Sequence, residues 1–139
     1  MQSPIRLSQE DYVLLQRLVR REAPGPKLAA DQTLVLGALL SAAEPVFNLR
    51  DLTHHAGLHD TITLVSPTDP ADRFTFKIVL PADENIDADL ISAAKPISLA
   101  ILGRRLDDVV SWNAPLGIRT MRIAGIHKTS SKVRLGQTS

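Results

Sequence analysis

The chain has 139 residues, of which 44% are hydrophobic and 22% are charged, and this composition is typical of a globular protein. A formal net charge of +1 argues against a general nucleic-acid binder, and the absence of cysteine excludes a disulfide framework, a thiolate zinc site and a cysteine nucleophile. No stretch approaches the roughly 20 apolar residues of a membrane helix, and no signal-peptide core follows the first residues. We therefore expect an unprocessed cytoplasmic protein with no membrane partner.

Residues 1–46 are predicted to form a short antiparallel helical hairpin. Ser8, followed by two acidic residues, is typical of a helix start, and apolar residues then recur at helical spacing over 12–19. The Pro-Gly-Pro of residues 24–26 must end that helix. A second amphipathic helix is predicted from about residue 27 to residue 43, and a short connection favours an antiparallel pair.

Residues 47–58 are interpreted as a linker, after which the apolar period changes from helical to two. Strands are predicted at 61–65, 73–80, 109–112 and 118–126, with a short strand at 89–92 and a short helix at 96–102. This order predicts an α+β fold with an antiparallel sheet and one helix on its face. Residues 128–139 have few apolar side chains and are predicted to be a flexible tail.

The run from residue 91 to residue 110, Ile-Ser-Ala-Ala-Lys-Pro-Ile-Ser-Leu-Ala-Ile-Leu-Gly-Arg-Arg-Leu-Asp-Asp-Val-Val, resembles the carboxy-terminal signature of the GreA/GreB transcription elongation factors. In that family a Ser-Pro run ending in Leu-Gly and a basic residue is followed by Gly-Asp and a strand. The strands before it and the Trp-Asn-Ala-Pro-Leu-Gly turn after it also match, so the resemblance covers residues 59–127. Two positions depart from the family pattern: Lys95 stands where Ser is usual, and Asp107 where Gly is usual.

The resemblance implies an FKBP-like domain over residues 59–127. In the family this domain docks on bacterial RNA polymerase at the rim of its secondary channel, and the hairpin points toward the active site. The hairpin here is short, like that of the Rnk subgroup. Nucleic acid would be contacted only indirectly, through polymerase. Carried over onto this chain, the expected polymerase-binding residues are Lys95, Pro96, Ile97, Leu99 and Arg104.

The hairpin tip bears on transcript cleavage. Cleavage-stimulating relatives carry acidic residues there, which help to hold a second magnesium ion at the polymerase active site. Here the tip is built from Arg21, Glu22 and Lys27, and one carboxylate among cations is a poor magnesium site. We expect no cleavage stimulation, no cofactor and no enzymatic activity. Glu22 is instead interpreted as an exposed helix-end residue that pairs with Arg21 or Lys27.

Two other groups of polar residues have a structural interpretation. His55 and His59 have the spacing of a helical zinc pair, with His54 beside them, but no third ligand is suitably spaced and Gly57 disfavours a helix. Loop histidines exposed to solvent are predicted, with no metal site. The Asp-Asp pair at 107–108 is expected to begin a strand rather than to act in acid–base chemistry.

Three functions follow in order of preference. The first is an RNA polymerase-binding regulator of elongation. The second is a peptidyl-prolyl isomerase of FKBP type, which needs an aromatic-lined pocket, although only 4% of the residues are aromatic. The third is a homo-oligomeric adaptor, in which the apolar run at 34–40 packs against a second copy to give a homodimer.

Overall fold

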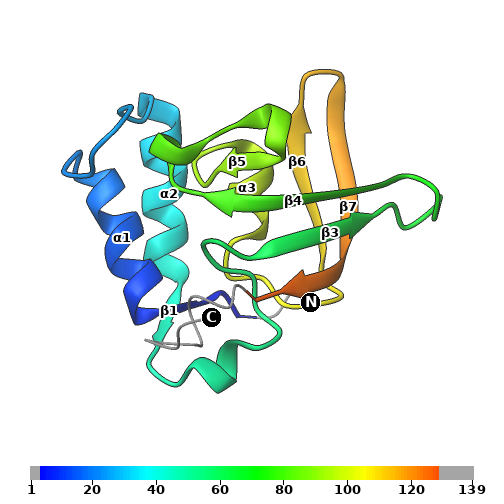
Figure 1. Ribbon diagram of the computed structural model, residues 1–139, viewed down its shortest axis with the longest axis horizontal. Helices are drawn as coiled ribbons and strands as arrows, with labels where there is room; N and C mark the ends of the chain where they lie inside the picture. The colour runs from blue at the N-terminus through cyan, green and yellow to red at the C-terminus, as the bar shows by residue number, and fades with distance from the viewer. Residues whose placement is uncertain (1–3, 129–139) are drawn as a thin grey trace.

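The structure, a computed structural model, describes residues 4–128 and consists of a helical pair packed beside a curled sheet (Figure 1). Its helices and strands, in chain order, are β1 (Arg6–Ser8), α1 (Gln9–Val19), α2 (Ala30–Ala42), β2 (Glu44–Val46), β3 (Thr61–Val65), β4 (Arg73–Val79), β5 (Leu90–Ser92), α3 (Pro96–Ile101), β6 (Val109–Ala114) and β7 (Gly117–His127). Short 3-10 turns are η1 (Leu49–Leu52), η2 (Pro81–Asp83) and η3 (Ile86–Ala88). The predicted α+β class is confirmed, and the helices and strands end close to their predicted limits.

The helical hairpin forms as the apolar spacing predicts. Ser8 caps α1, because its Oγ accepts a hydrogen bond from the Asp11 backbone N–H at 3.0 Å. α1 and α2 run antiparallel side by side (Figure 1) and bury leucines between them, and the Tyr12 hydroxyl donates to the Leu40 carbonyl at 3.2 Å. The hairpin is therefore held by packing and by one polar contact across its two helices.

A two-stranded parallel ribbon at the base of the hairpin was not predicted. β1 pairs with β2, so that Arg6 lies opposite Glu44, and the Arg6 Nε atom is 3.0 Å from Glu44 Oε1. Each strand has only three residues, too few for an alternating pattern to be visible in the sequence. The ribbon ties the start of α1 to the end of α2.

The main sheet has the strand order β5-β4-β3-β7-β6 (Figure 1). Three of its pairings are antiparallel, as predicted, but β5 pairs parallel with β4. The wholly antiparallel prediction is therefore wrong at this edge. The physical reason is the connection: residues 80–89, which contain η2 and η3, carry the chain back to the level of Lys77, so that β5 runs beside the last residues of β4 in the same direction.

The hairpin and the sheet share one hydrophobic core. Leucines of both helices belong to the same buried cluster as Ile62, Phe76 and Ile123 of the sheet. The segment 47–58, predicted as a linker, contributes buried residues to this cluster, including Ala56 and Leu58. It packs as part of the domain because its backbone is hydrogen-bonded to residues beyond α3.

Gly103 is the residue at which these distant segments meet. It follows α3 with φ +79°, its N–H donates to the Ala56 carbonyl at 2.8 Å, and its carbonyl accepts from the Arg6 N–H at 3.0 Å. A Cβ atom at this position would overlap Ile5 Cγ2. Glycine is therefore required both by the backbone conformation and by the close approach of the amino-terminal strand.

Asp107 has a left-handed backbone conformation, with φ +76°. This explains the glycine usual at this position in the family pattern, because glycine takes this conformation without strain and aspartate is among the few side chains that tolerate it. The Asp107 carboxylate also forms an ion pair with Arg122, whose Nη1 atom donates a hydrogen bond to Asp107 Oδ1 at 2.9 Å. Asp107 and Asp108 lie in the turn immediately before β6, which begins at Val109, one residue later than the predicted strand start at this pair.

Two glycine substitutions should have opposite effects on stability. Gly103→Ala should lower the free energy of unfolding by about 2 kcal/mol or more, because of the left-handed φ and the contact with Ile5. Gly37→Ala, inside α2 with open space around a new Cβ, should raise it by about 0.5–1 kcal/mol. Urea unfolding followed by circular dichroism measures both, and destabilisation by Gly37→Ala would contradict the assigned helix.

The Ser98 hydroxyl is fully buried in α3 and has no hydrogen-bond partner among the described residues. Ser98→Ala should therefore raise the free energy of unfolding by about 1 kcal/mol, because it removes an unsatisfied polar group and favours the helix. Ser92→Ala is the matched control: its buried Oγ accepts the Ala94 N–H at 3.1 Å, and its loss should destabilise by about 1 kcal/mol. Equal shifts of the two thermal melting curves in one direction would contradict this assignment.

Candidate functional site

The exposed side of α3 forms the centre of the candidate site. Pro96 occupies the first turn of this helix, where its missing N–H leaves no hydrogen bond unmade. Ser98 and Ile101 point into the core, while Lys95 and Pro96 are exposed and Ile97 is half-buried. The helix thus turns a short apolar ridge toward solvent.

Two depressions flank this ridge. The α2 groove, of about 430 Å³, lies between α2, α3 and β6 and is lined by residues that include Asp31, Val35, Pro96, Leu99 and Trp112. The η3 groove, of about 520 Å³, is lined by residues that include Ile86, Ile91, Lys95, Pro96, Ile97, Trp112 and Pro115. Pro96, Trp112 and Asn113 line both, so the two depressions form one continuous face.

Four of the five predicted polymerase-binding residues lie on this face. Lys95, Pro96 and Ile97 line the η3 groove, and Leu99 lines the α2 groove. Arg104 lies beyond the carboxyl end of α3 and lines neither groove, and its carbonyl accepts the Ala56 N–H at 2.9 Å. The structure therefore separates Arg104 from the other four.

Trp112 lies on β6, at the edge of the sheet, and is half-buried at the centre of the face. It also lines a third depression, of about 180 Å³, together with Phe74, Ile97 and Arg119. The alternation along β6 does place Trp112 on the same side as buried Val110. Its partial exposure depends on the short helix above it, which strand periodicity does not reveal.

The hairpin tip uses its basic residues to bind backbone. The Lys27 Nζ atom donates to the carbonyls of Arg21 and Ala23 at 3.3 and 3.2 Å, and the Arg21 guanidinium donates to the Leu28 carbonyl at 3.2 Å. These bonds satisfy carbonyls left without partners around the end of α1. The predicted pairing of Glu22 with Arg21 or Lys27 is not formed within residues 4–128, because both cations are directed to carbonyls.

The tip also rests on the sheet domain. Gly25, with φ +95°, lies so close to η2 that a Cβ atom on it would come within 2.7 Å of Ala82 Cβ. The hairpin therefore packs along the domain, with its tip against the turn that follows β4.

His54, His55 and His59 lie in different environments. No group of three or more potential metal-ligating side chains occurs in the described part of the chain, residues 4–128. His54 is exposed, as predicted, but His55 is only 5% exposed, so the prediction of three solvent-exposed rings is wrong for this residue. The His55 Nδ1 atom lies 2.9 Å from the Gly103 carbonyl oxygen, and this contact holds the ring beside Gly103.

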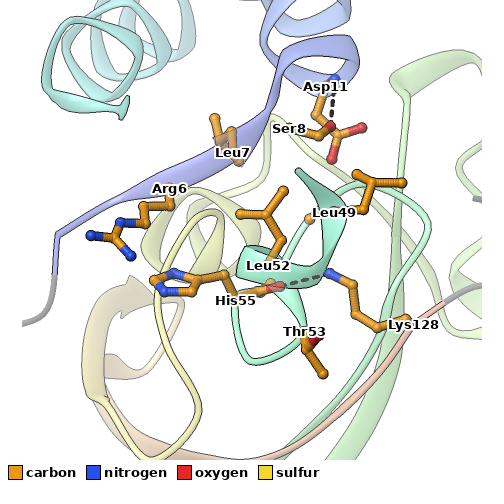
Figure 2. A pocket seen from close by; sticks show the side chains of 11 residues that line it. Arg6, Leu7, Ser8, Asp11, Leu49, Leu52, Thr53, His55 and Lys128 are labelled. Atoms are coloured by element: carbon orange, nitrogen blue, oxygen red, sulfur yellow. Dashed lines mark hydrogen bonds between the residues drawn. The ribbon is translucent and has the colours of Figure 1, made fainter. Parts of the chain in front are cut away.

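The environment of His55 favours the neutral ring. Its burial lowers the pKa from the usual 6.5, as do the positive charges of Arg6 and Arg105, against the opposing effect of the Gly103 carbonyl and the Asp108 carboxylate. Figure 2 shows the ring beside a cavity of about 60 Å³, which Arg6 and Leu52 also line. This volume is about that of one or two water molecules.

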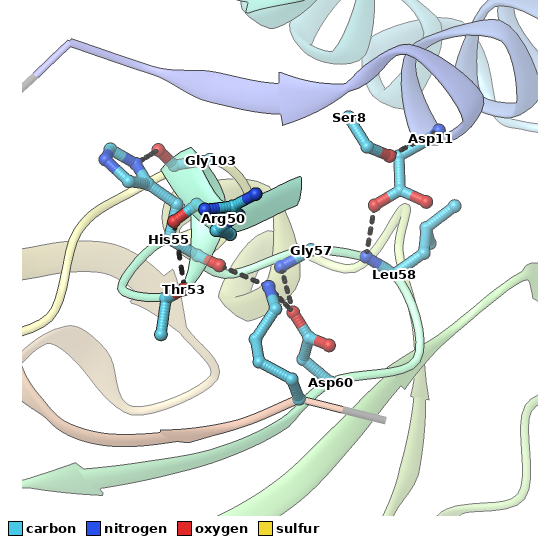
Figure 3. Close-up of polar contacts among 10 residues, drawn as sticks. Ser8, Asp11, Arg50, Thr53, His55, Gly57, Leu58, Asp60 and Gly103 are labelled. Carbon is cyan, nitrogen blue, oxygen red and sulfur yellow. Dashed lines mark hydrogen bonds and ion pairs between the residues drawn. The ribbon is translucent and has the colours of Figure 1, made fainter. Parts of the chain in front are cut away.

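Two buried carboxylates hold the loop between the hairpin and β3 (Figure 3). Asp11 on α1 accepts the Leu58 backbone N–H at 3.0 Å, and Asp60 accepts the Gly57 N–H at 2.8 Å. Lys128 Nζ lies 2.6 Å from Asp60 Oδ2 and donates to the His55 carbonyl at 2.8 Å (Figure 2). The charged side chains of Asp11, Asp60 and Lys128 therefore hold the backbone of this loop in place. From the sequence, Asp11 was expected in the first turn of a helix, but its contact with the loop and the roles of Asp60 and Lys128 were not predicted.

Lys128 was predicted to be the first residue of a flexible tail, and its two contacts instead fasten the end of β7 to this loop. The pairing of Thr61 with His127 in the β3–β7 ladder brings Asp60 and Lys128 together. The remainder of the predicted tail, residues 129–139, lies outside the described residues.

Comparison with known proteins identifies the family. The profile described as "Transcription elongation factor, GreA/GreB, C-term" matches residues 54–128. The chain belongs to the GreA/GreB family. Within it, the transcription inhibitor protein Gfh1 of Thermus thermophilus is 37% identical over 73 residues, covering 51% of this chain and 46% of that protein. The transcription elongation factor GreA of a Thermotoga species is 24% identical over 96 residues, covering 66% of this chain and 62% of that protein.

The GreA/GreB relationship extends to the fold of the hairpin as well as the domain. The solved structure of a GreA/GreB elongation factor from Nitrosomonas europaea has a TM-score of 0.73 and 23% identity, covering 91% of this chain and 99% of that one. This likeness is one of fold. The present chain spans about half the length of the Gfh1 relative. In residues 4–128, none of the helices has both the length and the apolar character needed to cross a membrane.

The lowered pKa of His55 predicts a pH-dependent stability. Below about pH 6.5 the unfolded chain takes up a proton at His55 more readily than the folded chain, so the free energy of unfolding should decrease as pH falls from 6.5. His55→Gln, which keeps an N–H for the Gly103 carbonyl, should lessen this decrease. Urea unfolding at pH 5.0 to 7.5 measures it, with His54→Gln as the control for an exposed ring. If His55→Gln and His54→Gln changed the pH dependence of the free energy of unfolding equally, burial would not be the cause of the lowered His55 pKa.

Proposed function

We propose that the protein is an RNA polymerase-binding regulator of transcription elongation that does not stimulate transcript cleavage. The observation that carries the proposal is the exposed face around Pro96 and Trp112. Both residues lie within the segment matched by the family profile, and the face presents the proline helix that the family resemblance assigns to polymerase docking. The expected setting is the bacterial cytoplasm, with the docking surface at the rim of the secondary channel.

The composition of the tip supports the absence of cleavage stimulation. Glu22 is the one acidic residue between α1 and α2, and Arg20, Arg21 and Lys27 lie near it in the chain. Holding a magnesium ion requires several oxygen ligands, which a single carboxylate does not supply. The tip also rests on η2 instead of projecting from the domain. The short hairpin fits a Rnk-like member of the family.

The two alternative functions have less support. Three leucines of the apolar run at 34–40, Leu36, Leu39 and Leu40, are buried in the chain's own core. Of the large apolar side chains of this run, Leu34 and Val35 are left for a homodimer contact, which weakens the case for a homodimer through the hairpin. The depression lined by Phe74 and Trp112 does provide an aromatic wall of the kind an FKBP-type isomerase needs. An isomerisation assay on a proline peptide tests that activity directly.

The proposal predicts binding to bacterial core RNA polymerase at micromolar concentration or below, in competition with a cleavage factor. Pro96→Ala should weaken binding by about fivefold or more, because it removes apolar surface at the centre of the face. Pro70→Ala, in an exposed turn outside both grooves, is the matched control and should bind as the wild type does. Fluorescence anisotropy with labelled protein measures these affinities.

The cleavage half of the proposal has its own readout. Backtracked elongation complexes incubated with the protein should release no cleaved transcript above the background of polymerase alone. Lack of binding by the wild-type protein would overturn the polymerase assignment, and stimulated cleavage would overturn the inactive-tip assignment while leaving docking intact.

A further inference from the structure

The sheet has a second face, turned away from the core, which the proposed function does not use. Ile62 of β3, Phe76 of β4 and Ile123 of β7 are buried in the core, so the residues beside them in each strand point the other way. We call this surface the outer sheet face. It consists of the outward residues of β3, β4, β6 and β7, among them Thr63, Arg73, Thr75, Lys77, Ser111 and Arg122.

Three cations lie at the margins of the outer sheet face. Arg73 of β4 and Arg122 of β7 are both paired with Val65 of β3, so their Cα atoms are about two strand spacings, or about 10 Å, apart. Lys77 is paired with Thr61, four residues along β3, which places it about 13 Å from that row. The three positive charges therefore frame an area of about 10 by 13 Å.

The floor of this area consists of small side chains with hydroxyl groups. Thr63 lies between Thr75 and Gly125, and its Oγ1 atom is 3.1 Å from Thr75 Oγ1. Beside them, Ser111 Oγ is 2.8 Å from Thr120 Oγ1. Because Gly125 has no side chain and the others are short, the floor is flat and offers hydrogen-bond donors and acceptors across its width.

The charge of the outer sheet face is positive although the whole chain is nearly neutral. The strands β3, β4, β6 and β7 contain no aspartate or glutamate. Within residues 4–128, Arg73 and Lys77 form no ion pair, and Arg122 pairs with Asp107 in the turn before β6. The net charge of +1 therefore conceals a surface on which basic residues are separated from acidic ones.

We infer that the outer sheet face binds double-stranded RNA across its minor groove. Arg, Lys and hydroxyl side chains are the usual partners of phosphate and sugar oxygens. The minor groove of A-form RNA is wide and shallow and displays 2′-hydroxyl groups, which a flat floor of hydroxyls can contact while cations at its margins reach the phosphates. The minor groove of B-form DNA, about 6 Å wide and about 7.5 Å deep, does not admit a flat sheet.

The placement of the aromatic residues favours a duplex over a single strand. Phe74 stacks on Phe76, and Phe74 and Trp112 line a depression on the opposite side of the sheet. The outer sheet face thus has no aromatic ring on which unpaired bases could stack, as they do in proteins that bind single strands. This inference does not depend on polymerase docking. It differs from the expectation that nucleic acid is contacted only through polymerase.

Fluorescence anisotropy of the full chain with a short fluorescein-labelled RNA duplex of mixed sequence tests the inference. Contact of two or three cations with phosphates should give a slope of about −2 to −3 for the logarithm of the association constant against that of the salt concentration. Arg73→Gln and Lys77→Gln should each weaken binding by about fivefold at low salt and make the slope less steep by about one. Arg20→Gln, which removes an exposed charge at the end of α1, is the matched control and should bind as the wild type does.

The contact with the 2′-hydroxyl groups has a separate test. Thr75→Val keeps the shape and charge of the side chain and removes its hydroxyl group. It should weaken binding to the RNA duplex by about threefold and leave weaker binding to a DNA duplex of the same sequence unchanged. Unchanged thermal melting of the three β4 variants establishes that they fold.

Each outcome decides the inference. Salt-dependent binding of the RNA duplex that is weakened in the β4 variants and not in Arg20→Gln supports it. Absence of binding at low salt, or equal weakening by Arg20→Gln, would overturn the outer sheet face as a binding site. Equal or tighter binding of the DNA duplex, or of either single strand, would overturn the choice of double-stranded RNA. Because polymerase is absent from this experiment, none of these results changes the test of the proposed function.

Discussion

The arrangement of the whole molecule depends on the backbone around Gly103. At this residue the first strand, the loop before β3 and the exit of α3 share hydrogen bonds, and the His55 ring closes the same carbonyl. Because Gly103 has no side chain, the amino-terminal strand can approach closely enough to form these bonds. Without that approach, β1 and the hairpin that follows it would lose their position relative to α3, and the α2 groove would lose one wall.

Buried charge acts in the same region and has a structural purpose. Asp11 and Asp60 are almost fully buried, and each accepts a backbone N–H from the loop between the hairpin and β3. Burying a carboxylate is unfavourable unless it is hydrogen-bonded or paired with a cation. Both Asp11 and Asp60 accept backbone hydrogen bonds, and Asp60 also forms an ion pair with Lys128. The carboxylates therefore specify how the hairpin meets the domain. Their burial in backbone contacts argues against a catalytic role.

The proposed docking face and the hairpin tip illustrate how one family fold can support different activities. The helix α3 and its surrounding sheet lie in the segment that the family shares. The tip lies outside that segment, and its cations are bound to carbonyls of the turn itself. Glu22 is the one acidic residue of this turn, and a single carboxylate does not supply the several oxygen ligands that a magnesium ion needs. The proposed regulator would therefore keep polymerase docking and lack the chemistry of cleavage factors.

The sequence by itself determined the longer helices and strands and the resemblance to the family. Helical spacing in the first third, alternation in β3 and β4, and the signature around Pro96 each depend on neighbouring residues along the chain, so they can be read locally. Tertiary structure decided which strands pair, that β5 runs parallel to β4, and that His55 is buried. It also decided that Arg104 lines neither groove, while Trp112 and residues of α2 line the surface beside Pro96. These features arise from contacts between residues far apart in sequence, and local periodicity carries no information on such pairs.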